Sequence, residues 1–188
     1  MPCNYLRDHA GYVAGLGVLD SYGLSLDLHL TTEQLADAAE LFATKAPESL
    51  KVVINHLACG PRLGCGEGHA DADEAAQWAR WRSGMAAMAA RPSTFVKLSA
   101  PTVVHSEWTR DAAARGAVKT AVREAIALFG PERCMVASNF PVDRSVAPCT
   151  AADVFELLFE AASEALEGDA ASLKRVFHDT AVGFYKLE

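Results

Sequence analysis

Short apolar runs alternate with longer helical runs along this chain, and this alternation constrains the fold more than any other feature of the sequence. Four runs have the length and pattern of strands, at residues 24–30, 51–57, 94–99 and 134–139. Helical patterns lie around them, at residues 12–22, 31–46, 73–90, 110–129, 150–166 and 170–186. Because parallel neighbouring strands need a long return connection, the alternation predicts a parallel α/β sheet with crossover helices.

Local signals support the helix boundaries. Thr31 and Gln34 fit a capping box at the start of the second helical run. The Gly130-Pro131 pair is a stop signal for the long fourth run. A stripe of large side chains recurs at helical spacing in the third run and indicates core packing. The stripe consists of Trp78, Trp81, Met85 and Met88.

Two architectures fit this pattern, an open doubly wound sheet and part of a closed barrel. Periodicity does not separate them. The open sheet would favour a small-molecule binder, but the glycine fingerprint expected of that class is absent from the sequence. Both architectures place their working residues at the carboxyl ends of the strands.

Every predicted strand delivers a polar or ionisable side chain to that end. A buried sheet tolerates such groups poorly unless they are paired or functional. We therefore expect Asp27, His56, Lys97 and Asn139 to converge at one edge of the sheet. The complete set of candidate site residues is Asp27, His29, His56, Lys97, Asn139 and Asp143.

Structural roles compete with functional ones at these positions. His56 could be a core histidine bonded to backbone, and Asp27 could simply pair with His29 or Lys97. Lys97 lies within an apolar strand, so it needs a carboxylate partner or a bound anion. Asn139 and Asp143 flank a proline turn that they could stabilise. These alternatives stay open at the level of sequence.

The glycine-rich loop at residues 60–69 carries a weaker signal. Its G-x-G-x-G spacing matches neither the dinucleotide fingerprint nor the P-loop. Cys59, Cys65 and His69 form a loose group without a C-x-x-C pair or a clear fourth ligand. We interpret the segment as a flexible loop.

Charge and composition exclude some classes of partner. The net charge of −7 offers no basic field for nucleic acid or an anionic membrane. No apolar run approaches the roughly 20 residues of a membrane span, and the first residues do not resemble a secretory signal. Five cysteines form an odd, sparse set, which favours reduced thiols and a cytoplasmic location. We expect a single domain over residues 1–188.

Five segments together resemble one family, the amidohydrolase-related lactonases that include fuconolactonases and 2-pyrone-4,6-dicarboxylate lactonase. They are GLSLDLHL, KVVINHLACGP, TFVKLSA, FGPERCMVASNFPVD and VFHDTAVGFYKL. The resemblance covers nearly the whole chain but only the second half of the family pattern. It implies a partial (β/α)₈ TIM barrel in which the four strands are the fifth to the eighth.

The resemblance also implies roles for the site residues. In such sites a carboxylate at the end of the eighth strand activates water, while cations and imidazoles bind the substrate and polarise the lactone carbonyl. His56 and Asn139 take the catalytic positions, with Asp143 as a substitute for the base. Asp27, His29 and Lys97 take the substrate-binding positions. The expected activity is hydrolysis of a lactone or similar cyclic ester.

Two departures qualify this expectation. The family's first strand carries a His-x-His pair, which this sequence lacks, so we predict no tightly bound zinc and no other cofactor. Asn139 stands where many relatives have Asp, and an amide cannot accept a proton at neutral pH. The activity is therefore expected to be impaired by truncation, and the alternative is a non-catalytic barrel remnant or binding module. Open strand edges predict self-association.

Overall fold

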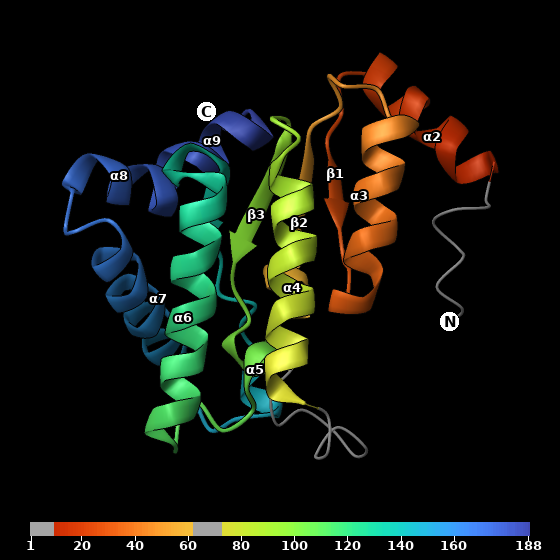
Figure 1. The fold of residues 1–188 in the computed structure, drawn as a ribbon. Coiled ribbons are helices and arrows are strands. Elements are labelled where there is room, and N and C mark those ends of the chain that lie inside the picture. Colours follow the sequence, from red (N-terminus) through yellow and green to blue (C-terminus); the bar gives the residue numbers. More distant parts are fainter. Residues whose placement is uncertain (1–9, 62–72) are drawn as a thin grey trace.

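The computed structural model describes residues 10–61 and 73–188, where helices and strands alternate as predicted (Figure 1). The strands are β1 (Leu26–Leu28), β2 (Val52–Ile54), β3 (Thr94–Leu98) and β4 (Cys134–Val136). They form a four-stranded sheet in the order β1-β2-β3-β4, and each neighbouring pair is parallel. The prediction of an α/β fold with four parallel strands is confirmed.

Most predicted helices are present within a residue or two of their expected bounds. In chain order the α-helices of the described residues are α2 (Ala10–Ser21), α3 (Leu35–Thr44), α4 (Glu74–Ala89), α5 (Pro101–Val104), α6 (Ala112–Phe129), α7 (Ala151–Ala165), α8 (Ala170–Lys174) and α9 (Thr180–Tyr185), of which α5 was not predicted. The capping box forms, since the Gln34 side chain accepts from the Thr31 N–H at 3.0 Å. The last predicted helix is divided, because a π-helical segment, Arg175–Asp179, joins α8 to α9.

The strands are shorter than predicted, and after β2, β3 and β4 the backbone soon leaves the extended conformation. His56 follows β2 with φ of 56°, Ala100 follows β3 with φ of 54°, and Asn139 follows β4 with φ of 55°. All three are non-glycine residues in the left-handed region, where single residues are uncommon and strained. The sequence pattern continues past these points, but the regular strands do not.

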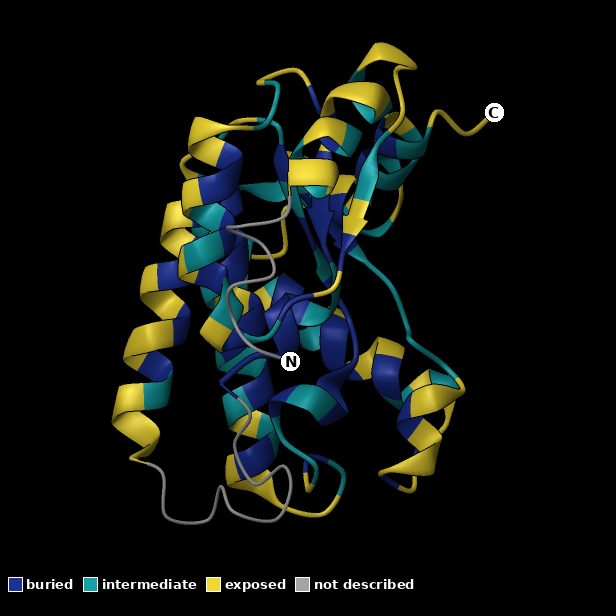
Figure 2. Cartoon of the chain, turned by 90° about the vertical axis from the view of Figure 1, so that its right-hand side faces the viewer, coloured by how far each residue is buried: buried dark blue, intermediate teal, exposed yellow. Residues whose placement is uncertain are grey.

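One face of the sheet packs against the helices and forms the main core. Leu28, Ile54, Val96 and Leu98 point to this side, and the large side chains of α3, α4 and α6 join them. The Trp and Met stripe of α4 is buried there, as predicted. Figure 2 shows the resulting pattern, in which the helices carry exposed residues on their outer sides and buried residues toward the sheet.

The opposite face of the sheet meets the C-terminal helix. Val53 and Met135 pack there with Phe184 of α9, and the Phe95 and Phe184 ring centroids are 4.9 Å apart. Figure 1 shows α9 at the end of the sheet where the strands begin. The carboxyl ends of the strands therefore lie at the other end, away from this apolar contact.

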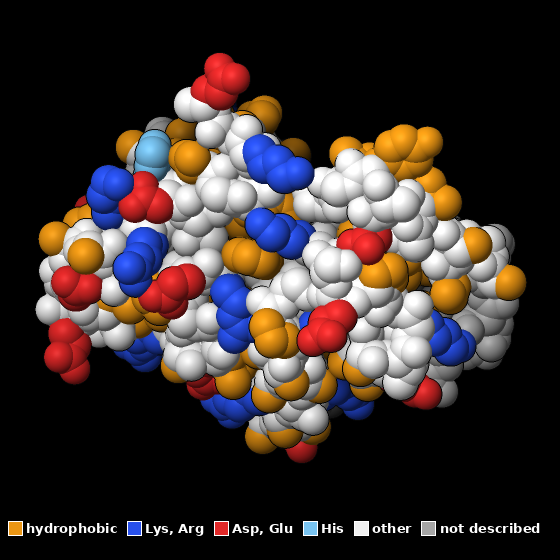
Figure 3. Space-filling view, turned by 90° about the horizontal axis from the view of Figure 1, so that it is seen from above, with side chains coloured by type: hydrophobic (Ala, Val, Ile, Leu, Met, Phe, Trp, Pro, Cys, Tyr) orange, Lys and Arg blue, Asp and Glu red, His pale blue; other side chains and the backbone are white. Residues whose placement is uncertain are grey.

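The surface shows no field of one sign on the face seen in Figure 3. Basic and acidic side chains are interspersed there with apolar ones. None of the helices described has the length and apolar content needed to cross a membrane. The described cysteines, Cys59, Cys134 and Cys149, are buried and form no disulfide with one another, and burial raises the pKa of the last two. The cytoplasmic location stays a prediction.

Candidate functional site at the carboxyl ends of the strands

The chain makes a left-handed turn directly after β2, which we call the His56 turn (Asn55–Cys59). His56, Leu57, Ala58 and Cys59 all have φ between 52° and 58°. A left-handed helical conformation costs roughly 1–2 kcal/mol per L-residue. Strain of this kind persists only where the surrounding structure fixes it, and it concentrates at functional sites.

Three contacts fix the His56 turn. The buried Trp81 indole of α4 donates to the Leu57 carbonyl at 2.8 Å, and the Gly60 N–H donates to the same carbonyl at 2.9 Å. The Thr32 hydroxyl donates to the Gly60 carbonyl in a short hydrogen bond. Gly60 itself has φ of 56°, and a Cβ there would lie 2.7 Å from the Val104 side chain, so only glycine fits.

The turn presents the His56 ring between the ends of β1 and β3. Its Nδ1 lies 2.8 Å from the Ser99 hydroxyl oxygen. The His29 ring lies edge-on, with centroids 5.7 Å apart. Burial lowers the pKa of His56 below its ordinary value, and the charges of His29 and Lys97 add to this while Asp143 opposes it. The imidazole is therefore neutral at pH 7.

Asn139 and Asp143 meet after β4. The Asn139 amide donates to Asp143 Oδ2 at 2.8 Å, and the Thr102 N–H and hydroxyl both donate to Oδ1, the former at 3.1 Å. Asp143 is completely buried. With three donors and no exposure, its carboxylate holds α5 to the loop after β4 and does not face a substrate in this arrangement.

Asp27 and Lys97 pair with each other, as one of the structural alternatives anticipated. The Lys97 ammonium lies 2.6 Å from Asp27 Oδ2, and the Tyr185 hydroxyl donates to both oxygens of Asp27 at 2.8 and 3.0 Å. Burial lowers the pKa of Lys97, but the bonds to Asp27 and Tyr185 outweigh it and the pKa is raised. This polar network joins β1, β3 and α9 and carries no net charge.

The predicted residues thus fall into two connected groups. At the strand ends a series of contacts runs from His29 through His56 to Ser99. A second series joins Asn139 to Asp143 and Thr102, and the influence of Asp143 on the pKa of His56 links the two. The second group is the polar network of Asp27, Lys97 and Tyr185, which joins β1 and β3 to α9. The functional roles assigned to these residues stay predictions.

Sequence reasoning missed the partners that hold the candidates in place. Thr102 lies in α5, which was not predicted, and Tyr185 belongs to a segment noticed only as a closing helix. Trp81 was assigned to the core without its hydrogen bond. The only available signal for Tyr185 was a polar-tipped aromatic residue on an apolar helix, which needs a partner when buried.

The described residues do not by themselves fit a zinc site. Zinc sites use three or four protein ligands, and among residues 10–61 and 73–188 no three His, Cys, Asp or Glu side chains are grouped to hold a metal ion. Cys59 lies 3.9 Å from His29, whereas Cys65 and His69 lie outside the described residues. The absence of a tightly bound zinc ion therefore stays a prediction.

Four parallel strands and crossover helices, with polar groups following the strands, are the arrangement of a segment of a (β/α)₈ barrel. The chain belongs to the amidohydrolase family, whose family model matches residues 5–187. Two structures of an amidohydrolase from Burkholderia multivorans, one with bound zinc and one with bound Hepes, superpose with TM-scores of 0.82 and 0.84. They are 24% and 25% identical to this chain, and each match covers 99% of it.

These relatives are longer than the chain. The match covers 60% and 61% of the two Burkholderia chains. An uncharacterized protein, y4mH, from Sinorhizobium fredii is 29% identical over 174 residues, which is 92% of this chain and half of that protein. A Pseudomonas putida protein described as a 2-pyrone-4,6-dicarboxylic acid hydrolase is 21% identical over 96% of this chain, with a TM-score of 0.65 and 58% of its own length covered. The chain therefore spans half to three fifths of the relatives it matches.

Proposed function

We propose that this chain carries the proton-transfer and substrate-binding groups of a hydrolase that opens hydroxylated lactones. The observation that carries the proposal is the strained His56 turn, which holds a neutral imidazole at the carboxyl ends of the strands. A neutral imidazole is the side chain best suited to accept a proton from water near pH 7.

In the proposed reaction His56 is the proton acceptor. With Nδ1 protonated, its N–H donates to Ser99 Oγ and Nε2 is free to accept. Water adds to the lactone carbonyl and gives its proton to Nε2. The ring C–O bond then breaks, and the departing alkoxide takes that proton, so that one lactone and one water yield one hydroxy acid. This role compensates for Asn139, which cannot act as a base.

Asn139 orients the water in this scheme. Its amide nitrogen is engaged by Asp143 at 2.8 Å, which leaves Oδ1 as the free end and a hydrogen-bond acceptor. Asp143 acts through Asn139 as a positioning residue, since it is buried and bonded to Thr102. The proposal therefore differs from the expectation that Asp143 itself replaces the base.

The polar network favours hydroxyl groups on the substrate. Because Lys97 is already neutralised by Asp27, the pair offers a strong acceptor and a strong donor without excess positive charge. The Asp27 side chain is 41% exposed and can accept from a sugar hydroxyl. Binding of a dicarboxylate substrate would need cationic side chains that are not already paired, and Lys97 is paired with Asp27. We therefore propose that the substrate is a neutral polyhydroxylated lactone. The 2-pyrone name of one relative supports a cyclic ester in general.

A pH-stat assay on the purified chain with a panel of sugar lactones and 2-pyrone-4,6-dicarboxylate tests the proposal. We expect turnover of a sugar lactone, falling as pH falls through the lowered pKa of His56, and a loss of about 10²-fold or more in His56→Gln. The matched control is His178→Gln, because His178 is an exposed residue beside α8 and α9.

The alternative is a module that binds such lactones without hydrolysing them. Isothermal titration with the same panel distinguishes the two. Binding that depends on Asp27 and Lys97 without turnover would support the module and refute the hydrolase. Equal activity in the two histidine variants would remove His56 from the chemistry.

A further inference from the structure

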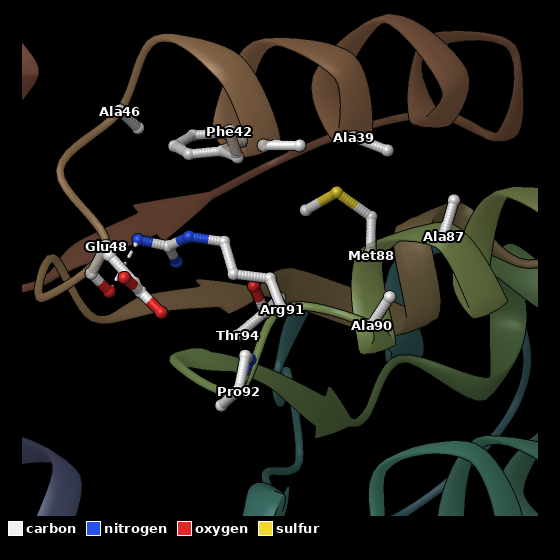
Figure 4. A pocket seen from close by; sticks show the side chains of 11 residues that line it. Ala39, Phe42, Ala46, Glu48, Ala87, Met88, Ala90, Arg91, Pro92 and Thr94 are labelled. Atoms are coloured by element: carbon white, nitrogen blue, oxygen red, sulfur yellow. Dashed lines mark hydrogen bonds between the residues drawn. The ribbon is translucent and has the colours of Figure 1, made fainter.

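A cavity of about 310 Å³ lies between α3, the end of α4 and the first residue of β3. Figure 4 shows it from close by. Its walls are mainly apolar and include Ala39, Phe42 and Met88. Arg91 and Thr94 bring polar groups into it. The volume is at the small end of ligand pockets, which span about 300–1,000 Å³.

Arg91 is held rigidly at this cavity by one of its two terminal nitrogens. Nη2 donates to the carbonyls of Pro47 and Leu50, both at 2.7 Å, and of Glu48 at 3.2 Å. The guanidinium also lies 5.9 Å from the centre of the Phe42 ring. The other nitrogen, Nη1, is buried and has no hydrogen-bond partner among the described residues.

Thr94 contributes a second buried polar group that lacks a hydrogen-bond partner among the described residues. Its side chain is completely buried, and its hydroxyl oxygen has no partner within residues 10–61 and 73–188. Only six buried side-chain nitrogen or oxygen atoms of the described residues lack a partner, and two of them belong to residues that line this one cavity. Buried polar groups are normally hydrogen-bonded, so the coincidence indicates a missing acceptor.

We propose that this cavity binds a short-chain aliphatic monocarboxylate. One carboxylate oxygen accepts from Arg91 Nη1 and the other from the Thr94 hydroxyl, while the alkyl chain lies against Phe42 and Met88. Charge-assisted bonds of this type are the strong ones. Burial lowers the pKa of Arg91, although Glu48 and Asp20 oppose this, so an added negative charge is favoured there.

Glu48 limits the ligand to a single charge. Its carboxylate is exposed and lines the cavity near Arg91 (Figure 4). A second carboxylate on the ligand would meet this like charge, whereas a monocarboxylate places its charge at the buried guanidinium. Because Thr94 begins β3 and His56 follows the end of β2, the cavity lies at the other end of the sheet from the proposed hydrolase site. The proposal does not depend on the hydrolase activity.

Titration of the purified chain with sodium butyrate, followed by amide chemical shifts in NMR, tests the proposal. We expect saturable shifts at Arg91 and Thr94, and none with n-butylamine or with sodium chloride at equal ionic strength. Thr94→Val should weaken binding about three- to tenfold, as expected for loss of one hydrogen bond. Ala39→Leu should fill the cavity and abolish binding, whereas Ala86→Leu, an exposed position of α4 that does not line the cavity, should not.

Two results would overturn the proposal. One is the absence of saturable shifts, which would mean that water and not a carboxylate forms hydrogen bonds with Arg91 and Thr94. Shifts spread over surface lysines and arginines would count in the same way, because they would mean non-specific ionic contact. The other is unchanged butyrate binding in Ala39→Leu. Thermal unfolding of each variant confirms that it is folded, and Thr94→Val keeps the test open if Ala39→Leu does not fold.

Discussion

Replacing Trp81 by Phe should release the strain of the His56 turn. The substitution removes the indole N–H that donates to the Leu57 carbonyl at 2.8 Å. Leu57 is only 1% exposed, so water cannot easily take over as the donor. A turn whose residues have φ above 50° then loses the bond from α4 that holds it in place.

The size of this effect follows from the buried carbonyl. The Leu57 carbonyl keeps the Gly60 N–H as a donor, so the substitution removes one of its two hydrogen bonds, at a cost of about 0.5–1.5 kcal/mol. The smaller ring adds a packing loss, which a second variant, Trp78→Phe, reproduces. Trp78 lies one turn earlier in α4, is 8% exposed, and packs edge-on against Trp81 with centroids 5.6 Å apart. The difference between the variants isolates the hydrogen bond.

Thermal or urea unfolding measures that difference. For a chain of this size 1 kcal/mol corresponds to about 2–4 °C in Tm, so Trp81→Phe should melt about 1–6 °C below Trp78→Phe. NMR titration should also show the lowered pKa of His56 returning toward 6.5 in Trp81→Phe alone. Equal melting temperatures together with an unchanged His56 pKa would refute the idea that this bond fixes the turn.

Two further outcomes follow from the site. Because the pKa of His56 is lower in the folded chain than in the unfolded one, its contribution to stability is complete above pH 6.5 and is lost as pH falls through the folded pKa. Urea unfolding between pH 5 and 7 should therefore show a smaller dependence on pH in His56→Gln than in the wild type. Asp143→Asn should lower stability by about 1–3 kcal/mol, because its new N–H₂ would oppose the Asn139 amide or the Thr102 donors. Asp111→Asn, at the N-cap of α6, is the near-neutral control, since Asn caps as well as Asp, and equal losses in both would contradict this account.

The sheet and most helices could be predicted because their signals are local. Apolar runs and stop signals such as Gly130-Pro131 depend on neighbouring residues, and they located the four strands along the chain. The same pattern placed His56 and Asn139 after β2 and β4, whereas Asp27 and Lys97 lie within β1 and β3. This is the part of the site that periodicity can supply.

The conformations and pairings at the site could not be predicted because they depend on distant residues. The sequence from His56 to Cys59 contains no glycine, and its left-handed turn is held by Trp81, 24 residues away from Leu57. The partner of Lys97 is 70 residues away in sequence, so the choice between a carboxylate and a bound anion stayed open. The burial of Asp143 depends on Thr102 in a four-residue helix that has no periodic signal.

The hydrogen bond between Tyr185 and Asp27 joins residues 158 positions apart. Contacts of such long sequence separation gain stability only after the loop-closure entropy of the intervening chain has been lost. If α9 docks after the sheet has formed, Lys97 and Asp27 pair before Tyr185 joins them. Amide hydrogen exchange in α9 should then report the last step by which the polar network is completed.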